Sequence, residues 1–226
     1  KIPKPNFTTK KSKGQEIACA VLSDIQLAKV TPTYNTEVAE ERVVRYAHKI
    51  VEITNIQRQA TNITKCAVFA VGDIVEGELI FPGQEHLIDA SLYNQVTVDA
   101  PRILTQFFDI LLANFEEVDV HWVIGNHGHL GGRSRKNYHP DSNADRMLGK
   151  IMEMIYAKEK RIKWTIPDST GDNHWFDIAD LGEKCRFFLW HGDNVRGFGG
   201  FPWYGFGKKI MGWKTLASQG LMPDFN

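Results

Sequence analysis

Four short apolar runs in this chain each end in a small cluster of polar residues, and this repeated pattern constrains the fold more than any other feature. The runs are Ile17 to Leu22, Cys66 to Val71, Val118 to Ile124 and Cys185 to Trp190, and the clusters are Ser23-Asp24, Gly72-Asp73, Gly125-Asn126-His127 and His191-Gly192-Asp193. Apolar runs of this length, bounded by turn residues, are typical of buried β-strands. We therefore expect four strands whose carboxyl ends carry polar side chains.

Helical periodicity separates these strands. We expect helices over residues 37–59, 86–115 (interrupted at Pro101) and 145–158, and two further strands over 162–166 and 174–178. Strands that alternate with helices favour an α/β layered fold. In such folds ligands bind beyond the carboxyl ends of the strands, which is where the polar clusters are expected to lie.

Composition limits the class of protein. The 226 residues are 42% apolar and 24% charged, which is typical of one globular domain, and no apolar run approaches the roughly 18 residues of a membrane span. Basic and acidic residues both number 27, so a dedicated nucleic-acid binder with a strongly basic domain is not indicated. The three cysteines are widely spaced in apolar surroundings, and we interpret them as reduced, buried thiols of an intracellular, cytoplasmic protein.

The first fourteen residues differ from the rest. Residues 1–14 carry five lysines and two prolines without an apolar period, which predicts a basic flexible tail or an extended edge segment. Residues 15–226 are expected to form the single domain. Because the chain begins at Lys1 rather than methionine, we interpret its start as trimmed or incomplete.

The four polar clusters resemble, in the same order, the metal motifs of the calcineurin-like metallophosphoesterase superfamily. The motifs are Asp24-Ile25-Gln26, Gly72-Asp73, Gly125-Asn126-His127 and His191-Gly192-Asp193, so the resemblance extends from about Ile17 to Asp193. A Gly-Asp pair alone is a weak signal, whereas Gly-Asn-His directly after a strand is more specific. The resemblance implies a four-layer α-β-β-α sandwich and hydrolysis of phosphate esters at a two-metal site.

The resemblance also implies a role for each motif residue. Asp24 would ligate the first metal, Asp73 would bridge both, and Asn126 and His191 would ligate the second. His127 would contact the phosphate and protonate the leaving oxygen as a general acid. The implied cofactors are two divalent ions, with manganese preferred and iron, zinc or magnesium as alternatives.

The sequence departs from the family pattern in two places. Gln26 stands where the family usually has histidine, and its amide oxygen is a weaker ligand for borderline metals than imidazole. We nevertheless include Gln26 among the predicted metal ligands. The family's closing Gly-His-x-His motif does not follow His191, and residues 221–226 look like the lead-in to the strand that carries it. We therefore expect this chain to lack the C-terminal strands of the fold.

Other residues are candidates for substrate contact. His129 lies in the loop after Gly-Asn-His, and Arg133 and Arg135 belong to a basic, glycine-containing segment suited to a phosphate backbone. Residues 196–213 interleave cations with aromatic rings, as a single-strand stacking surface does. The alternative for residues 197–213 is a glycine-rich loop that folds its aromatic side chains onto the core.

Three functions remain open from the sequence. The first is a phosphodiesterase similar to SbcD-type DNA repair nucleases, with DNA or another nucleic acid as its partner. The second is a phosphomonoesterase similar to Ser/Thr protein phosphatases, although the arginines that these carry beside their motifs are missing at Val75-Glu76-Gly77 and Gly128-His129. The third is an inactive interaction module similar to the small subunits of some replicative polymerases. The oligomeric state is not indicated.

Overall fold

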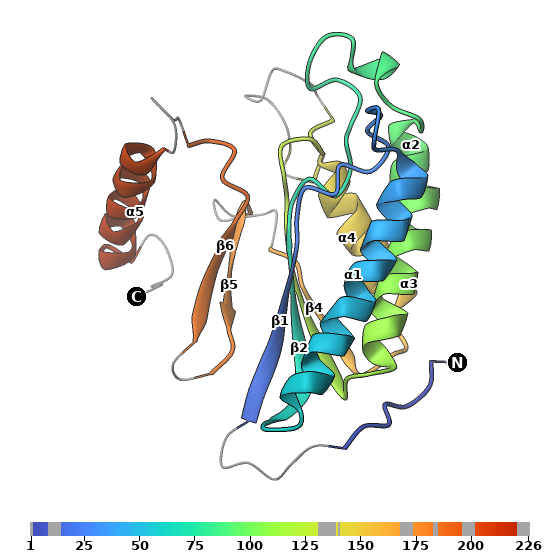
Figure 1. Cartoon of the computed structure of the whole chain (residues 1–226). Coiled ribbons are helices and arrows are strands. Elements are labelled where there is room, and N and C mark those ends of the chain that lie inside the picture. Colours follow the sequence, from blue (N-terminus) through green and yellow to red (C-terminus); the bar gives the residue numbers. More distant parts are fainter. Residues whose placement is uncertain are drawn as a thin grey trace.

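A four-stranded parallel sheet forms the centre of the protein. A computed structural model describes residues 2–8, 15–130, 139, 141–167, 174–182, 185–195 and 202–220 (Figure 1). The strands are β1 (Gln15–Leu22), β2 (Asn62–Val71), β3 (Glu117–Val123) and β4 (Ile162–Thr165), hydrogen-bonded in that order. The predicted alternation of strands and helices in an α/β fold is therefore confirmed.

Three long helices cover one face of this sheet (Figure 1). They are α1 (Thr36–Gln57), α3 (Ala100–Leu112) and α4 (Ala144–Ile155). Short helical segments precede α3, namely η1 (Gln84–His86), α2 (Leu92–Asn94) and the π-helical turn η2 (Gln95–Asp99). The main core lies between these helices and the sheet, with Phe107, Phe108 and Trp122 fully buried.

The predicted helix over residues 86–115 changes its helical pitch just before Pro101, where an interruption was expected. The helical segment starts at Leu92 rather than His86, and Pro101 is the second residue of α3, directly after the π-helical turn. Proline has no backbone N–H and its ring clashes with the preceding turn, and a π-helical turn relieves both constraints locally. The expected interruption at Pro101 is thus a change of helical pitch.

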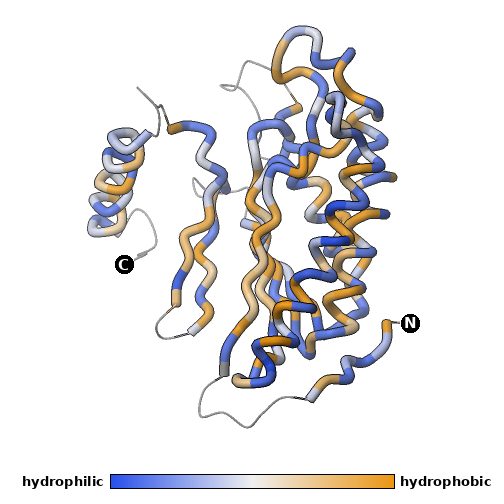
Figure 2. The backbone as a smooth tube through the Cα atoms, viewed as in Figure 1, coloured by the Kyte–Doolittle hydropathy of each residue, from blue (hydrophilic) through white to orange (hydrophobic). Residues whose placement is uncertain are grey.

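A second sheet packs against the opposite face. Its antiparallel strands are β5 (Phe176–Asp180) and β6 (Arg186–Trp190). Alternate residues of β2 serve the two faces, since Val68 lies in the helix-side core whereas Phe69 packs towards Ala179 and Leu189. Figure 2 shows the strands of the central sheet as largely hydrophobic and the helices as amphipathic, which agrees with a sheet covered on both sides.

Helix α5 (Trp203–Ser218) lies on the outer side of the second sheet (Figure 1). The ring of Trp213 packs against Phe188 and Trp190, with centroid distances of 5.0 and 4.7 Å. The expectation of a glycine-rich loop is therefore wrong for residues 203–213, and residues 197–201 lie outside the described residues. Burial of Trp213 stabilises a helix that its internal glycines alone would disfavour.

The cysteines only partly match expectation. All three are free, but Cys19 and Cys185 are exposed and only Cys66 is buried, so the expectation of three buried thiols is wrong. Cys19 lies on β1, which is an edge strand, and Cys185 directly precedes β6. Burial raises the pKa of the Cys66 thiol to about 12.

The described part of the N-terminal segment, residues 2–8, lies against the domain. The guanidinium of Arg58 stacks 3.8 Å from the centroid of the Phe7 ring, and Ile2 packs against the main core. Within the described residues, no helix is both long enough and apolar enough to cross a membrane.

Candidate metal centre

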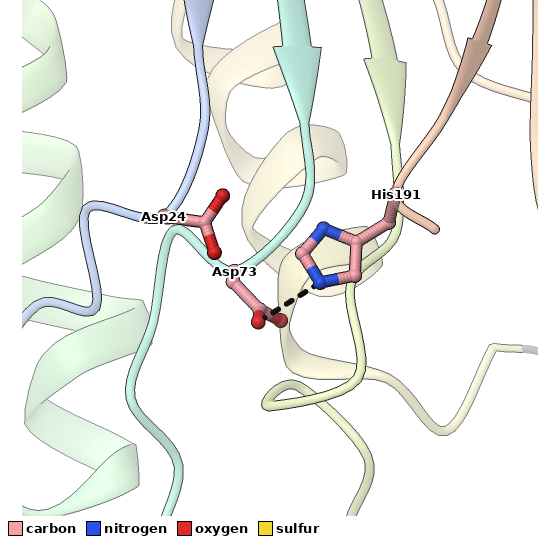
Figure 3. A group of neighbouring side chains, drawn as sticks. All are labelled: Asp24, Asp73 and His191. Atoms are coloured by element: carbon pink, nitrogen blue, oxygen red, sulfur yellow. Dashed lines mark ion pairs between the residues drawn. The ribbon is translucent and has the colours of Figure 1, made fainter. Parts of the chain in front are cut away.

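The loops after β1, β2 and β6 bring Asp24, Asp73 and His191 together (Figure 3). Each of the three offers a ligand atom within 4.8 Å of the others. The Nε2 atom of His191 lies 3.0 Å from Oδ2 of Asp73 and 3.1 Å from Oδ1 of Asn126, which follows β3. Two carboxylates, one amide and one imidazole therefore meet at the carboxyl edge of the central sheet.

The backbone at this edge is held in an uncommon conformation. Asp24, Gln26 and Asp73 have φ values of 52°, 47° and 53°, in the left-handed region that non-glycine residues seldom adopt. A Cβ atom on Gly72 would lie 2.5 Å from the Cα of Gly125, so the loops after β2 and β3 touch backbone to backbone. Such strain is typical of functional sites whose side chains are aimed by the surrounding fold.

Backbone hydrogen bonds join the first two loops. The N–H groups of Gln26 and Leu27 donate to the carbonyls of Asp73 and Ile74, both at 2.9 Å. The N–H of Asp24 donates to Gly72 at 3.2 Å. The positions of Asp24 and Asp73 are therefore fixed relative to each other before any ligand binds.

The side chain of Asp145 links the loops that follow β2 and β3. Its fully buried carboxylate accepts hydrogen bonds from the N–H groups of Asp73 and Gly125, both at 2.9 Å, and from that of Ile74 at 3.1 Å. Burial, and then the charge of Asp73, raise the pKa of Asp145 to about 6. Sequence reasoning missed this residue, because an acid in the first turn of a helix is ordinary there and only the tertiary contacts reveal its partners.

The protonation of His191 and that of Asp73 depend on each other. Burial lowers the pKa of His191, but the hydrogen bond and charge of Asp73 outweigh burial and raise that pKa to about 9. Burial likewise opposes ionisation of Asp73, yet His191 holds the pKa of Asp73 below its ordinary value. The carboxylates and the carbonyl oxygen of Val71, 2.9 Å from His191 Nδ1, thus create a region that favours a cation.

His127 is positioned by a second carboxylate. The backbone N–H of His127 donates to Oδ1 of Asp73 at 2.8 Å. The ring Nδ1 of His127 lies 2.8 Å from the carbonyl oxygen of Glu76 and 3.2 Å from its Oε2. Its Nε2 lies 3.9 Å from Oδ2 of Asp73, on the side of the candidate metal centre. Burial lowers the pKa of His127, but Glu76 and Asp73 outweigh burial and raise it.

Glu76, which sequence reasoning did not select, is held by two buried glutamines. The side-chain amide of Gln84 donates to the carbonyl oxygen and to Oε1 of Glu76 at 2.8 and 3.1 Å. Oε1 of Gln95 accepts from the N–H groups of Glu76 and Gly77 at 3.0 and 3.2 Å. A glutamate after a Gly-Asp turn was the available signal, but its burial could not be inferred from the sequence.

The remaining predicted site residues are Gln26, His129, Arg133 and Arg135. Oε1 of Gln26 accepts a hydrogen bond from Nζ of Lys29, so its role as a metal ligand stays a prediction. His129 is half-buried and lines, together with His191 and His174, a cavity of about 230 Å³ beside the centre. The predicted substrate residues Arg133 and Arg135 lie outside the described residues.

No protein-family model matches the chain, and no curated protein matches it.

Proposed function

We propose that this protein is a metal-dependent hydrolase of phosphate esters with a two-metal site of the calcineurin-like metallophosphoesterase type. The observation that carries the proposal is the convergence of Asp24, Asp73, Asn126 and His191 at one edge of the parallel sheet. These residues come from four separate strand ends. In the same proposal, the two sheets and their flanking helices form the four-layer α-β-β-α sandwich of that superfamily.

The donor set fits divalent metal ions. A buried carboxylate, Asp73, lies within reach of a second carboxylate, an imidazole and an amide oxygen, which together suit manganese, iron or zinc. In this assignment Asp24 and Gln26 would hold the first ion, Asn126 and His191 would hold the second, and Asp73 would contribute to both. When bound, two such ions supply a nucleophilic water and neutralise charge on the phosphoryl oxygens.

Protonation of the leaving oxygen is assigned to His127. Because Glu76 binds its Nδ1, the Nε2 atom is the one available to carry a proton towards the substrate. Glu76 and Asp73 raise the pKa of His127, which favours the protonated form of the ring. His127 then donates it to the leaving oxygen as the ester bond breaks, and Glu76 fixes the ring orientation during the transfer.

The residues beside the aspartate and histidine motifs favour a diester over a monoester. A terminal phosphate carries additional negative charge, which monoesterases meet with cationic side chains beside the metals. Val75 and Gly128, which follow the aspartate and histidine motifs, supply no such charge. The proposed substrate is therefore a phosphodiester, with a nucleic acid backbone as the natural example.

The proposal is tested by hydrolysis of bis(p-nitrophenyl) phosphate and p-nitrophenyl phosphate with manganese, iron, zinc or magnesium. We expect metal-dependent hydrolysis that prefers the diester and is abolished by Asp73→Asn. The matched control is Asp180→Asn, which changes an exposed carboxylate on the β5–β6 hairpin. Failure of every metal to support hydrolysis by wild-type protein would contradict the proposal and favour an inactive interaction module.

A further inference from the structure

A second cavity opens directly beside Asp24, on the side of β1 that faces α1. Its volume is about 530 Å³, and this open cavity is bordered by the end of β1, the loop over residues 23–34 and the first turns of α1. This volume lies in the range of small-ligand sites. Because Asp24 lines the cavity and also belongs to the candidate metal centre, an occupant would be continuous with a substrate at that centre.

The charges that line this cavity suit a phosphate group. Lys29 and Arg42 are its cationic side chains, and Asp24 is the carboxylate among its described lining residues. A carboxylate that binds metal no longer repels an anion, so the cavity presents two positive charges. Guanidinium groups bind phosphate oxygens in a bidentate manner, and a lysine ammonium adds a compact positive charge.

Both cations are held in place. Nζ of Lys29 donates to Oε1 of Gln26, and the guanidinium carbon of Arg42 lies 5.3 Å from the centroid of the Tyr34 ring. Such contacts reduce the conformational freedom that a side chain loses when it binds an anion. The half-buried ring of Tyr46, whose hydroxyl accepts from the N–H of Val21 at 3.1 Å, completes the wall with an aromatic group.

The loop that forms the cavity is preformed. Its backbone is bonded to the segment after β2 through Val30 N–H to Leu87 at 2.8 Å, and it closes on itself through the pair Thr31 and Tyr34. The hydroxyl of Tyr34 donates to the carbonyl of Ile25. The binding surface therefore exists without a rearrangement of the loop.

We infer that this cavity binds the nucleotide next to the cleaved bond, with its non-scissile phosphate on Lys29 and Arg42. The inference rests on the proposed function and deepens it, because it makes a polynucleotide rather than an isolated diester the preferred substrate. The aromatic wall suits a nucleoside, since bases stack on such rings irrespective of sequence. Specificity would come from the second phosphate, which a simple diester lacks.

The test uses three dinucleotides that differ only in a terminal phosphate, namely dTpdT, pdTpdT and dTpdTp. Cleavage of the internal bond is followed by chromatography in manganese buffer. For wild-type protein we expect one of the phosphorylated dinucleotides to have a kcat/KM about tenfold above that of dTpdT, as expected for one charge-assisted contact. Arg42→Gln and Lys29→Gln should each reduce this ratio towards one.

The control is Arg45→Gln, which removes an exposed arginine of the same helix that pairs with Glu41 outside the cavity. It should leave the ratio unchanged. Equal kcat/KM values for all three dinucleotides, or a ratio that survives Arg42→Gln and Lys29→Gln, would overturn the inference while metal-dependent hydrolysis persists.

A binding measurement tests the cavity independently of hydrolysis, and so distinguishes a failure of this inference from a failure of the proposed function. If bis(p-nitrophenyl) phosphate is not hydrolysed at all, the proposed function fails by itself. Calorimetric titration of wild-type protein with thymidine 3′,5′-bisphosphate then tests the cavity directly. Binding that Arg42→Gln weakens about tenfold and Arg45→Gln leaves intact would support the inference, and absence of binding would overturn it.

Discussion

The Nε2 atom of His191 lies 3.0 Å from Oδ2 of Asp73, although the two residues follow strands of different sheets. The contact therefore joins the central parallel sheet to the β5–β6 hairpin at the carboxyl ends of β2 and β6 (Figure 3). In the proposed function both residues serve the second metal ion. Packing between the sheets and chemistry at the site consequently depend on each other.

Metal binding should be unequal between the two proposed ion positions. The second position keeps Asp73, Asn126 and His191, whereas at the first Gln26 already accepts a hydrogen bond from Lys29. Manganese titration followed by electron paramagnetic resonance should therefore show one stronger site. His191→Ala should weaken it at least tenfold and Gln26→Ala much less. Equal losses in the two variants would contradict this asymmetry.

Asp145 should support the site through the backbone. Asp145→Asn replaces one acceptor oxygen with a donor that faces buried N–H groups, and unmade buried hydrogen bonds cost free energy. We expect the free energy of unfolding to fall by about 2 to 4 kcal/mol, together with weaker manganese binding. Urea denaturation measures the first effect. Glu153→Gln, at a solvent-accessible carboxylate of the same helix that pairs with Lys150, is the control and should change neither quantity appreciably.

Gly125 should not tolerate a side chain. A Cβ atom there would lie 2.1 Å from Oδ1 of Asp73, so Gly125→Ala must displace the proposed bridging carboxylate. We expect loss of manganese binding in a calorimetric titration. Gly212→Ala is the matched control, because its Cβ would meet no atom within 4 Å and alanine is favoured over glycine inside α5. Normal metal affinity in Gly125→Ala would show that the loop can move without consequence.

His127 should act as a general acid rather than as a metal ligand. His127→Ala is expected to leave the metal content unchanged while slowing a diester with an alkoxide leaving group by about 10²- to 10⁴-fold. A diester with a nitrophenolate leaving group needs little protonation and should be slowed much less. Steady-state kinetics on the two substrates measures this contrast. Equal slowing on both would restrict His127 to phosphate binding.

Much of the framework follows from sequence pattern. The strand ends at Asp24, Asp73 and Asn126 were predictable because apolar runs end there in polar turn residues, and parallel strands present their carboxyl ends at one edge. The placement of His191 beside Asp73 required the second sheet to pack in one orientation. Strand periodicity alone does not specify that orientation.

Other parts were not accessible from sequence. Glu76 and Asp145 are acids whose importance comes from burial and from backbone donors supplied by distant loops. Helix α5 contains several glycines that disfavour a helix locally, and burial of Trp213 against the second sheet outweighs this preference. Exposure of Cys19 likewise depends on β1 being an edge strand.

Whether Asp24, Asp73, Asn126 and His191 bind metal can be tested by anomalous X-ray diffraction from crystals grown with manganese. We expect an anomalous difference peak among these side chains, with Nε2 of His191 turned from hydrogen bonding with Asp73 to metal coordination. The peak should be absent from isomorphous crystals of Asp73→Asn. Wild-type crystals in saturating manganese that retain the His191–Asp73 hydrogen bond, with no anomalous peak at the site, would show that these residues do not bind metal.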